Sequence, residues 1–379
     1  MSDGLKTIKV KLVPSEDFKY LNNMVDIAGI IYNTAITIEN EYYEETGLYL
    51  GKYALQKTLK ALGEVEDNNF WHLLNSQTIQ DVTDRIDRAF KLFFSNLKDG
   101  IKCSPPKRRN VKKAKSFTCK QCGYKILPNS SIRIGKKVFK YYDSYEGLLE
   151  RSKIRTLTVK RTKLGEIFIY ATTLVDITMG KSRDDRKAVG MDFGLKTFLT
   201  LSDESVIRSP EFFKNSLSSI RRANRNLSRK KQNSGNKKRA ILELERRHID
   251  IVNRRRDFFW KTARVLCKKY CVICIETLNM KTMQKRWGRK VSDLAYSEFV
   301  QILKFASKKF GTEIVEIEKF YPSTKKCSAC GYVKETIALK ERVYKCDVCG
   351  YVEDRDVNAA HNILNEGLSE LNKMKIRAS

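Results

Sequence analysis

Four cysteines in the C-terminal part of the chain have the spacing of metal ligands. Cys327 and Cys330 form one C-x2-C pair, Cys346 and Cys349 form a second, and fifteen residues separate the two pairs. This spacing is typical of a tetrahedral zinc ribbon, and a glycine after each pair permits the tight turn around the thiolates. Because four thiolates leave no open coordination position, we predict one structural Zn²⁺. The alternative is four reduced cysteines that only pack.

Three carboxylates occupy comparable places in apolar segments. Asp192 lies inside the run AVGMDF, Glu276 ends the run YCVICIE, and Asp356 precedes an apolar helical pattern directly after the cysteines. A carboxylate in a buried strand is costly unless it is paired or binds a cation. If the three acids converge, their repulsion raises their pKa values, and divalent cations relieve it.

Such a cluster is suited to phosphodiester hydrolysis. Two divalent ions held by carboxylates can activate a water and stabilise the leaving oxygen, and Mg²⁺ prefers ligands that are all oxygen. Asp192, Glu276 and Asp356 are therefore candidate ligands of two Mg²⁺. Two alternatives stay open: Asp356 stands where a helix N-cap is expected, and the three acids could be unrelated, because convergence is not visible in a sequence.

Hydrophobic periodicity predicts the elements of the N-terminal half. A strand over residues 5–13 precedes helices over about 15–45 and 76–97, with Ser15 as the expected cap of the first helix. Strands over 154–160 and 167–173 then form a hairpin that turns at Lys163-Leu164-Gly165. These patterns predict a β-barrel-like domain interrupted by a helical insert.

The C-terminal half has an α/β pattern. Two apolar strands flank a glycine turn, and Asp192 lies in the middle of the first strand. A helix leads into a strand over 270–276, and a helix over about 293–310 leads into a strand over 313–318. This order, with two inserted arms, is expected of an RNase H-like sheet whose acids meet at one edge. The predicted fold class is α/β, with an RNase H-like domain that carries the zinc ribbon.

The net charge of +30, from 74 Lys and Arg against 44 Asp and Glu, predicts a polyanionic partner. Residues 102–140 hold thirteen basic and no acidic residues, and residues 214–256 hold fifteen basic and three acidic ones. Nucleic acid is the expected partner; a membrane surface, solvated basic loops or solvated helices are the alternatives. The candidate contacts are Lys107, Arg108, Arg109, Lys112, Lys113, Arg221, Arg222 and Arg225.

The remaining cysteines and the hydropathy indicate the compartment. Cys119 and Cys122 resemble half a zinc knuckle, but Cys103 is the only nearby third thiol, so we expect no metal there. Ten cysteines fit a reducing cytosol, and the sequence has no run of eighteen apolar residues and no signal-peptide pattern. We expect a soluble intracellular protein.

The motifs GMDFGLKTFLTLSDE, VICIETLNMKTM, FYPSTKKCSACGYV and YKCDVCGYVEDRDVNAAHNIL resemble the three RuvC motifs and the zinc ribbon of the TnpB family. These transposon-encoded RNA-guided DNA nucleases are similar to the type V CRISPR effectors. The resemblance implies that Asp192, Glu276 and Asp356 are the catalytic triad. Asp354 fits less well, because the pattern Asp-x-Asn-Ala-Ala begins at Asp356, and Thr277 departs from the Asp that the family often has there.

The same resemblance implies a domain order and a function. The expected order is wedge 1–14, helical recognition insert 15–100, wedge 101–186, RuvC nuclease 187–319, zinc ribbon 320–352, and last RuvC motif with tail 353–379. It implies a monomeric, cytoplasmic prokaryotic endonuclease, nucleoid-associated when it acts, that binds guide RNA and cuts target DNA beside a short motif. The alternatives are a nuclease-inactive RNA-guided regulator and an RNA-independent transposase.

Overall fold

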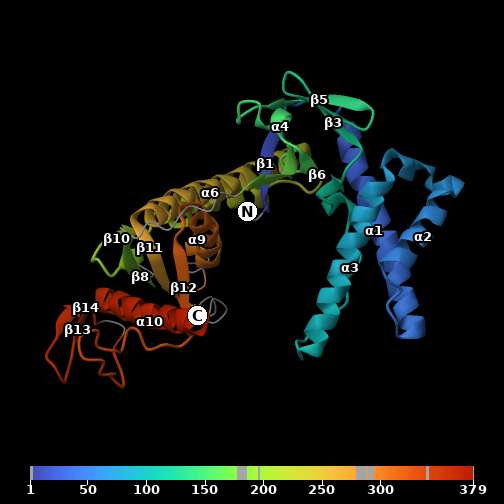
Figure 1. Cartoon of the computed structure of the whole chain (residues 1–379). Helices are drawn as coiled ribbons and strands as arrows, with labels where there is room; N and C mark the ends of the chain where they lie inside the picture. Colours follow the sequence, from blue (N-terminus) through green and yellow to red (C-terminus); the bar gives the residue numbers. More distant parts are fainter. Residues whose placement is uncertain are drawn as a thin grey trace. The chain divides into compact units, whose positions relative to one another are not determined.

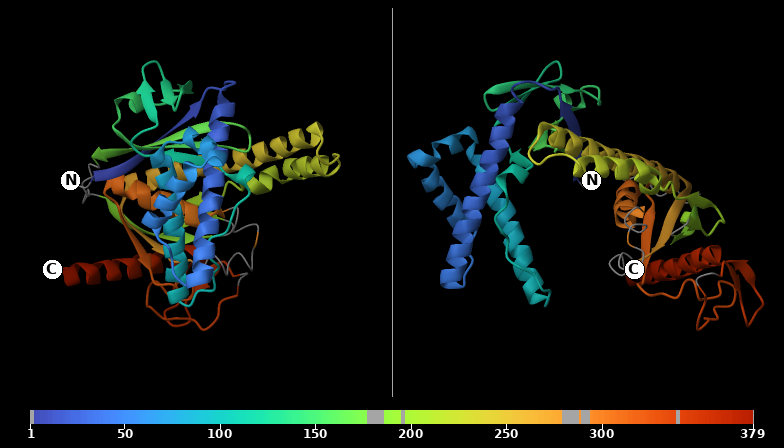
Figure 2. Two further views of the ribbon diagram at one scale, coloured as in Figure 1. Left: turned by 90° about the vertical axis from the view of Figure 1, so that its right-hand side faces the viewer. Right: turned by 180° about the vertical axis from the view of Figure 1, so that it is seen from behind.

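The computed structural model describes residues 3–176, 186–194, 197–278, 288, 294–338 and 341–378. The chain divides into two compact units, Met1–Ile177 and Thr178–Ser379. Each unit has its own buried core. Figures 1 and 2 show both units as ribbons coloured along the sequence. No helix in the described part of the chain is long and apolar enough to cross a membrane.

An antiparallel seven-stranded sheet organises the first unit, in the order β2-β6-β7-β1-β5-β4-β3. Its strands are β1 (Asp3–Leu12), β2 (Ser116–Cys119), β3 (Tyr124–Leu127), β4 (Ser131–Ile134), β5 (Lys137–Tyr142), β6 (Ile154–Arg161) and β7 (Ile167–Asp176). Only residues 120–123 connect the two edge strands, β2 and β3, so the sheet curls until its edges approach each other. The Tyr124 hydroxyl on β3 accordingly donates to the Ile154 carbonyl on β6 (3.3 Å). This nearly closed sheet agrees with the β-barrel-like expectation.

A helical insert separates β1 from β2. It contains α1 (Phe18–Thr46), α2 (Lys52–Gly63), the 3-10 helix η1 (Glu66–Leu73) and α3 (Ser76–Lys98). The helices bury one apolar face in the same core as the sheet, where Trp71 and Phe90 are among the largest enclosed side chains. The predicted cap Ser15 is wrong: Asp17 occupies the N-cap position of α1 without a side-chain capping bond.

The basic stretch 102–140 is more structured than a solvated loop. Residues 116–142 supply β2 to β5, and η2 (Val111–Lys113) precedes them. Along β4 and β5 the buried side chains Ile132, Ile134 and Phe139 alternate with exposed basic ones. A strand needs an apolar residue only at every second position, so the high charge concealed these strands in the sequence.

A five-stranded sheet in the order β10-β9-β8-β11-β12 organises the second unit. Its strands are β8 (Lys187–Phe193), β9 (Thr197–Leu201), β10 (Val206–Arg208), β11 (Tyr270–Glu276) and β12 (Glu313–Ile317). Strands β8, β11 and β12 are parallel neighbours, whereas β9 and β10 are antiparallel. The predicted strands therefore form, and they bring the segments of Asp192 and Glu276 side by side.

Helices cover both faces of this sheet. On one face pack α6 (Gly235–Lys269) and α9 (Tyr296–Phe310), with Ile273 and Ile275 of β11 in their core; α5 (Phe212–Ser228) pairs with α6. On the other face lies α10 (Arg355–Ala378), which packs near Cys274 (Figure 1). The predicted start of α9 near residue 293 falls outside the described residues, and the helix begins at Tyr296. The short strands β13 (Val343–Lys345) and β14 (Val352–Asp354) precede α10.

Candidate active site

The three predicted carboxylates lie where one edge of the sheet meets the start of α10. Asp192 is near the carboxyl end of β8, and Glu276 is the last residue of β11. The parallel register pairs Met191 with Ile275, so the next residue on each strand is one of the two acids. Asp356 lies in the first turn of α10. Since parallel strands end at a common edge, the fold brings the first two acids together directly.

A glycine brings the third acid close to this edge. A Cβ atom at Gly190 on β8 would overlap the Ala360 carbonyl oxygen and lie 2.6 Å from the Leu364 nitrogen of α10. Only a residue without a side chain permits this approach of strand and helix. The start of α10, with Asp356, is thereby held over β8.

The electrostatics show that the acids interact. Burial raises the pKa of Asp192 well above its ordinary value, the charges of Glu276 and Asp356 raise it further, and Arg355 opposes the rise. Burial also raises the pKa of Glu276. The three carboxylates are more widely spaced than the cysteines: within the described residues only the four cysteines place all their ligand atoms within 4.8 Å of one another. The charges of Glu276 and Asp356 therefore reach Asp192, an arrangement that a divalent cation would stabilise.

Ser323 holds Glu276, although no motif in the sequence points to this serine. Its buried hydroxyl donates a short hydrogen bond to Glu276 Oε1, which lowers the pKa of that carboxyl against the effect of burial. The Asn362 amide on α10 in turn donates to the Ser323 carbonyl (2.9 Å). Asn358 and Asn362 are both buried and lie four residues apart on the apolar face of α10. That buried polar pair was the available sequence signal, because buried amides require partners.

Asp354, not Asp356, caps α10. Its Oδ1 accepts the backbone N–H groups of Asp356 (2.9 Å) and Val357 (3.1 Å). The alternative reading of Asp356 as the helix cap is therefore wrong. Asp356 instead pairs with Arg355 (3.2 Å) and Arg342 (3.7 Å) and remains partly exposed.

The four cysteines of the predicted ribbon converge. The Sγ atoms of Cys327 and Cys349 lie 3.7 Å apart, and those of Cys330 and Cys346 lie 3.6 Å apart. Gly331 (φ +80°) and Gly350 (φ +74°) adopt the left-handed turn after each pair. The N–H groups of Cys349 and Val348 lower the pKa of Cys346 to about 6. A thiolate is the form that binds metal, so the donor set suits Zn²⁺.

The structure also locates the other candidate residues. Cys119 is buried with its Sγ 3.7 Å from the Thr78 hydroxyl, and burial raises the pKa of its thiol. Neither it, Cys122 nor Cys103 belongs to a metal-ligand group in the part of the chain that is described. All eight predicted nucleic-acid contacts are exposed. Five lie between α3 and β2 and three on α5: Lys107, Arg108, Arg109, Lys112, Lys113, Arg221, Arg222 and Arg225.

Two family models match segments that lie almost entirely within the second unit. A model of the OrfB_IS605 family, described as a probable transposase, matches residues 174–286. A model of the Cas12f1-like TNB domain matches residues 296–363. The first match contains Asp192 and Glu276, and the second contains the four cysteines, Ser323 and Asp356.

Relatives and a solved structure match over nearly the whole chain. A putative RNA-guided DNA endonuclease of Streptomyces pristinaespiralis is 27% identical, over 97% of this chain and 91% of the relative. The TnpB-like protein L770 of Acanthamoeba polyphaga mimivirus is 28% identical, over 97% of this chain and 74% of the relative. The solved Cas12f1–sgRNA–target DNA complex contains the same fold at 14% identity, with a TM-score of 0.57 over 96% of this chain and 99% of that chain. The chain is therefore similar to TnpB-like proteins and to putative RNA-guided DNA endonucleases, and it has a mixed α/β fold like that of Cas12f1.

Proposed function

We propose that the chain is an RNA-guided DNA endonuclease whose active site is the cluster of Asp192, Glu276 and Asp356. The observation that carries this proposal is the placement of the three acids at the carboxyl edge of the second sheet, where burial and the charges of Glu276 and Asp356 raise the pKa of Asp192. The names of the relatives support the reaction, and the net charge of +30 supports a nucleic-acid substrate.

The same proposal assigns a role to each part of the two units. The second unit is an RNase H-like, RuvC-type nuclease, with the four-cysteine ribbon inserted between β12 and α10. In the first unit the nearly closed sheet is the wedge domain, and α1 to α3 are the recognition insert. The exposed basic residues of 107–113 and of α5 would contact guide RNA, target DNA or their duplex, with the guide pairing to the target. The enzyme would act on DNA at the nucleoid.

The carboxylates suit Mg²⁺, because they are oxygen donors at one edge of the sheet, and burial together with the charges of Glu276 and Asp356 raises the pKa of Asp192. When bound, two such ions would supply the activation of a water and the stabilisation of the leaving oxygen. Ser323 fixes the orientation of Glu276, and Asp354 takes the capping role that would otherwise engage Asp356. The chain itself thus orients the acids toward a shared site.

A variant pair tests this function. We would co-express the protein with its native flanking DNA, sequence the RNA that co-purifies, and assay Mg²⁺-dependent cleavage of a matching target. Asp192→Ala should abolish cleavage while RNA and target binding stay nearly unchanged. Asp257→Ala, which removes an exposed acid from α6, should cut like the wild type.

Each alternative gives a different result in the same assay. A guided regulator would bind RNA and target without cutting even in the wild type. An RNA-independent transposase would purify without a specific RNA and join DNA strands in Mg²⁺ alone. Equal loss of binding and cleavage in Asp192→Ala would contradict the assigned catalytic role.

A further inference from the structure

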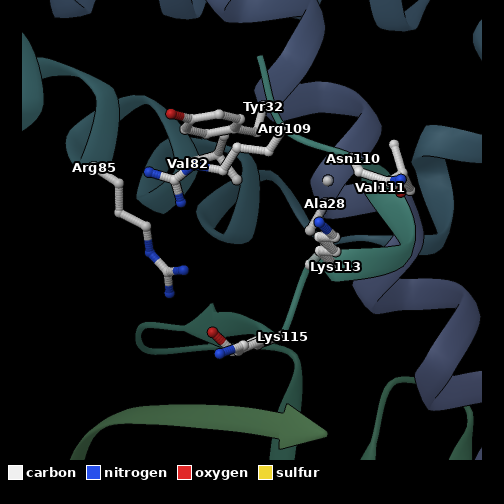
Figure 3. Close-up of a pocket in the computed structure, with 12 residues that line it drawn as sticks. Ala28, Tyr32, Val82, Arg85, Arg109, Asn110, Val111, Lys113 and Lys115 are labelled. Atoms are coloured by element: carbon white, nitrogen blue, oxygen red, sulfur yellow. The ribbon is translucent and has the colours of Figure 1, made fainter. Parts of the chain in front are cut away.

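A cavity of about 340 Å³ lies in the first unit between α1, α3 and the segment that leads into β2 (Figure 3). Its walls combine small apolar side chains with an aromatic ring and basic groups. The lining residues on which the argument depends are Tyr32, Arg85, Arg109, Asn110, Lys113 and Lys115. The volume is at the lower end of small-ligand sites, about 300 to 1,000 Å³.

The cavity is positively charged. Four of its lining residues are Lys or Arg, and none is Asp or Glu. Arg85 is already paired with Asp81 (2.6 Å) and the Thr118 hydroxyl (2.5 Å). Lys113 and Lys115 are exposed, and neither has an ion pair among the described residues. Two lysines are thus available to an anionic group such as a phosphate.

A flat stacking surface forms one wall. The Arg109 guanidinium lies over the Tyr32 ring, 4.6 Å from its centroid. Two hydrogen bonds to Asn33 on α1 fix the backbone of Arg109: its N–H donates to Asn33 Oδ1 (2.8 Å), and its carbonyl accepts from Asn33 Nδ2 (2.7 Å). Guanidinium planes and aromatic rings are the groups on which proteins stack unpaired bases.

The surrounding chain holds this wall in place. Arg161 on β6 donates to the Ala114 carbonyl (2.9 Å) and pairs with Asp26 on α1 (2.6 Å). Gly29 on α1 permits the close approach of Ala114, whose Cβ would lie 3.0 Å from a Cβ at Gly29. The cavity is therefore formed before any ligand arrives.

The cavity continues beyond the stacked pair. Tyr32 and Arg109 also line a second cavity of about 400 Å³, which reaches Pro106, Lys107 and Arg108. A small ligand that fits entirely within the first cavity would not need the second cavity. A chain of nucleotides would, because its backbone continues on both sides of a bound base.

We propose that this cavity holds one unstacked nucleotide of a single strand, with its base on the Tyr32–Arg109 pair and its phosphate near Lys113 and Lys115. The inference rests on the proposed nucleic-acid function and adds a single-nucleotide site to it. RNA and DNA present the same base and phosphate chemistry, so the experiment distinguishes them.

The test uses the full chain with short single-stranded RNA and DNA, each in a fluorescent form and in a form with one photoreactive 4-thio pyrimidine. Tyr32→Ala should weaken binding roughly 10-fold, the order expected when one stacked base is lost, whereas Tyr32→Phe should bind like the wild type. Arg109→Lys keeps the charge but loses the plane, so it should also weaken binding. Lys125→Ala removes an exposed charge outside the cavity and is the matched control.

Photocrosslinks of the thio nucleotide should map to Tyr32 or to residues 107–116. Crosslinking by RNA alone assigns the site to the guide, and crosslinking by DNA alone assigns it to the target. If Tyr32→Ala and Arg109→Lys both fold and bind as tightly as the wild type, the proposed nucleotide site is wrong. The proposed nuclease function would still stand if the wild type cuts its target. Failure of the wild type to bind either strand would instead contradict the proposed function.

Discussion

At the scale of single residues, the hydrogen bond from Ser323 sets the orientation of the Glu276 carboxylate. A carboxylate at the end of a strand can rotate, and a buried hydroxyl on one oxygen limits that rotation and favours the ionised form. Positioning of this kind affects the rate of a reaction more than the affinity for the substrate.

Ser323→Ala should therefore lower the cleavage rate by about 10- to 100-fold, while target binding stays within about twofold of the wild type. Single-turnover cleavage and binding assays would separate the two effects. Thr324→Val removes the neighbouring hydroxyl, which makes no hydrogen bond to Glu276, and should retain the wild-type rate. An unchanged rate in Ser323→Ala would contradict the positioning role.

Glu39 shows the cost of a buried carboxylate at a site without a partner charge. It is fully buried on α1, and neither of its oxygens makes a well-formed hydrogen bond among the described residues. Burial raises its pKa from 4.5 to about 7, the Leu50 amide opposes the rise, and Asp87 adds to it. Between these values the folded state binds more protons than the unfolded state, so stability falls as pH rises and levels off above about pH 7.

Glu39→Gln should remove this dependence. Between pH 4 and pH 8 the wild type should lose up to about 3 kcal/mol of unfolding free energy relative to the variant. Denaturant unfolding across that pH range measures the difference. Glu41→Gln, an exposed neighbour on the same helix, should follow the wild type. Parallel pH profiles for wild type and Glu39→Gln would show that Glu39 is ionised in the folded protein throughout.

At the scale of elements, α10 connects the ribbon with the sheet. Asp354 caps it, Asn358 and Asn362 bind the loop that carries Ser323, and Asp356 reaches the acid cluster. The close approach of α10 to β8 at Gly190 holds the helix, with Asp356 in its first turn, against the sheet.

Gly190→Ala should destabilise the second unit by more than about 2 kcal/mol, because its Cβ would overlap backbone atoms of α10 that have no room to move. Thermal unfolding and cleavage should both suffer. Gly235→Ala is the matched control: a Cβ there meets nothing within 4 Å, and it lies in the first turn of α6. A wild-type melting temperature in Gly190→Ala would exclude the close contact.

The ribbon is a second element whose stability should depend on its metal. Cys346→Ser, or a strong chelator, should remove one Zn²⁺ per chain and unfold the ribbon, since structural zinc contributes about 10 to 16 kcal/mol to modules of this kind. Metal analysis and circular dichroism would follow the loss. Cys122→Ser changes an exposed thiol outside the cysteine cluster and should keep the full zinc content. A folded, zinc-free and active Cys346→Ser would refute the ribbon.

At the scale of the whole molecule, the net charge of +30 determines how the protein responds to salt. Release of counterions from nucleic acid makes affinity fall steeply as salt rises. Target binding should therefore weaken by at least about 100-fold between 50 and 200 mM monovalent salt, measured with the RNA-loaded protein. An affinity that is flat across this range would mean that basic residues do not carry the binding.

The sequence by itself determined the features that depend on local spacing. Two C-x2-C pairs indicated the four cysteines that converge, apolar periodicity predicted α1, α3, β6, β7, β11 and β12, and the motif at residues 354–360 indicated Asp356 as the third candidate acid. The pattern failed in residues 116–142, where strands carry charge on alternate positions, and at Ser15, because a cap depends on local backbone geometry.

Only the tertiary structure decided what depends on contacts between distant residues. It brought Asp192, Glu276 and Asp356 into one electrostatic cluster, gave the capping role to Asp354, and paired Ser323 with Glu276. It also turned part of a basic stretch into one wall of a cavity that contains Tyr32. The physical reason is that convergence and burial arise from packing across the chain, which residue spacing along it does not encode.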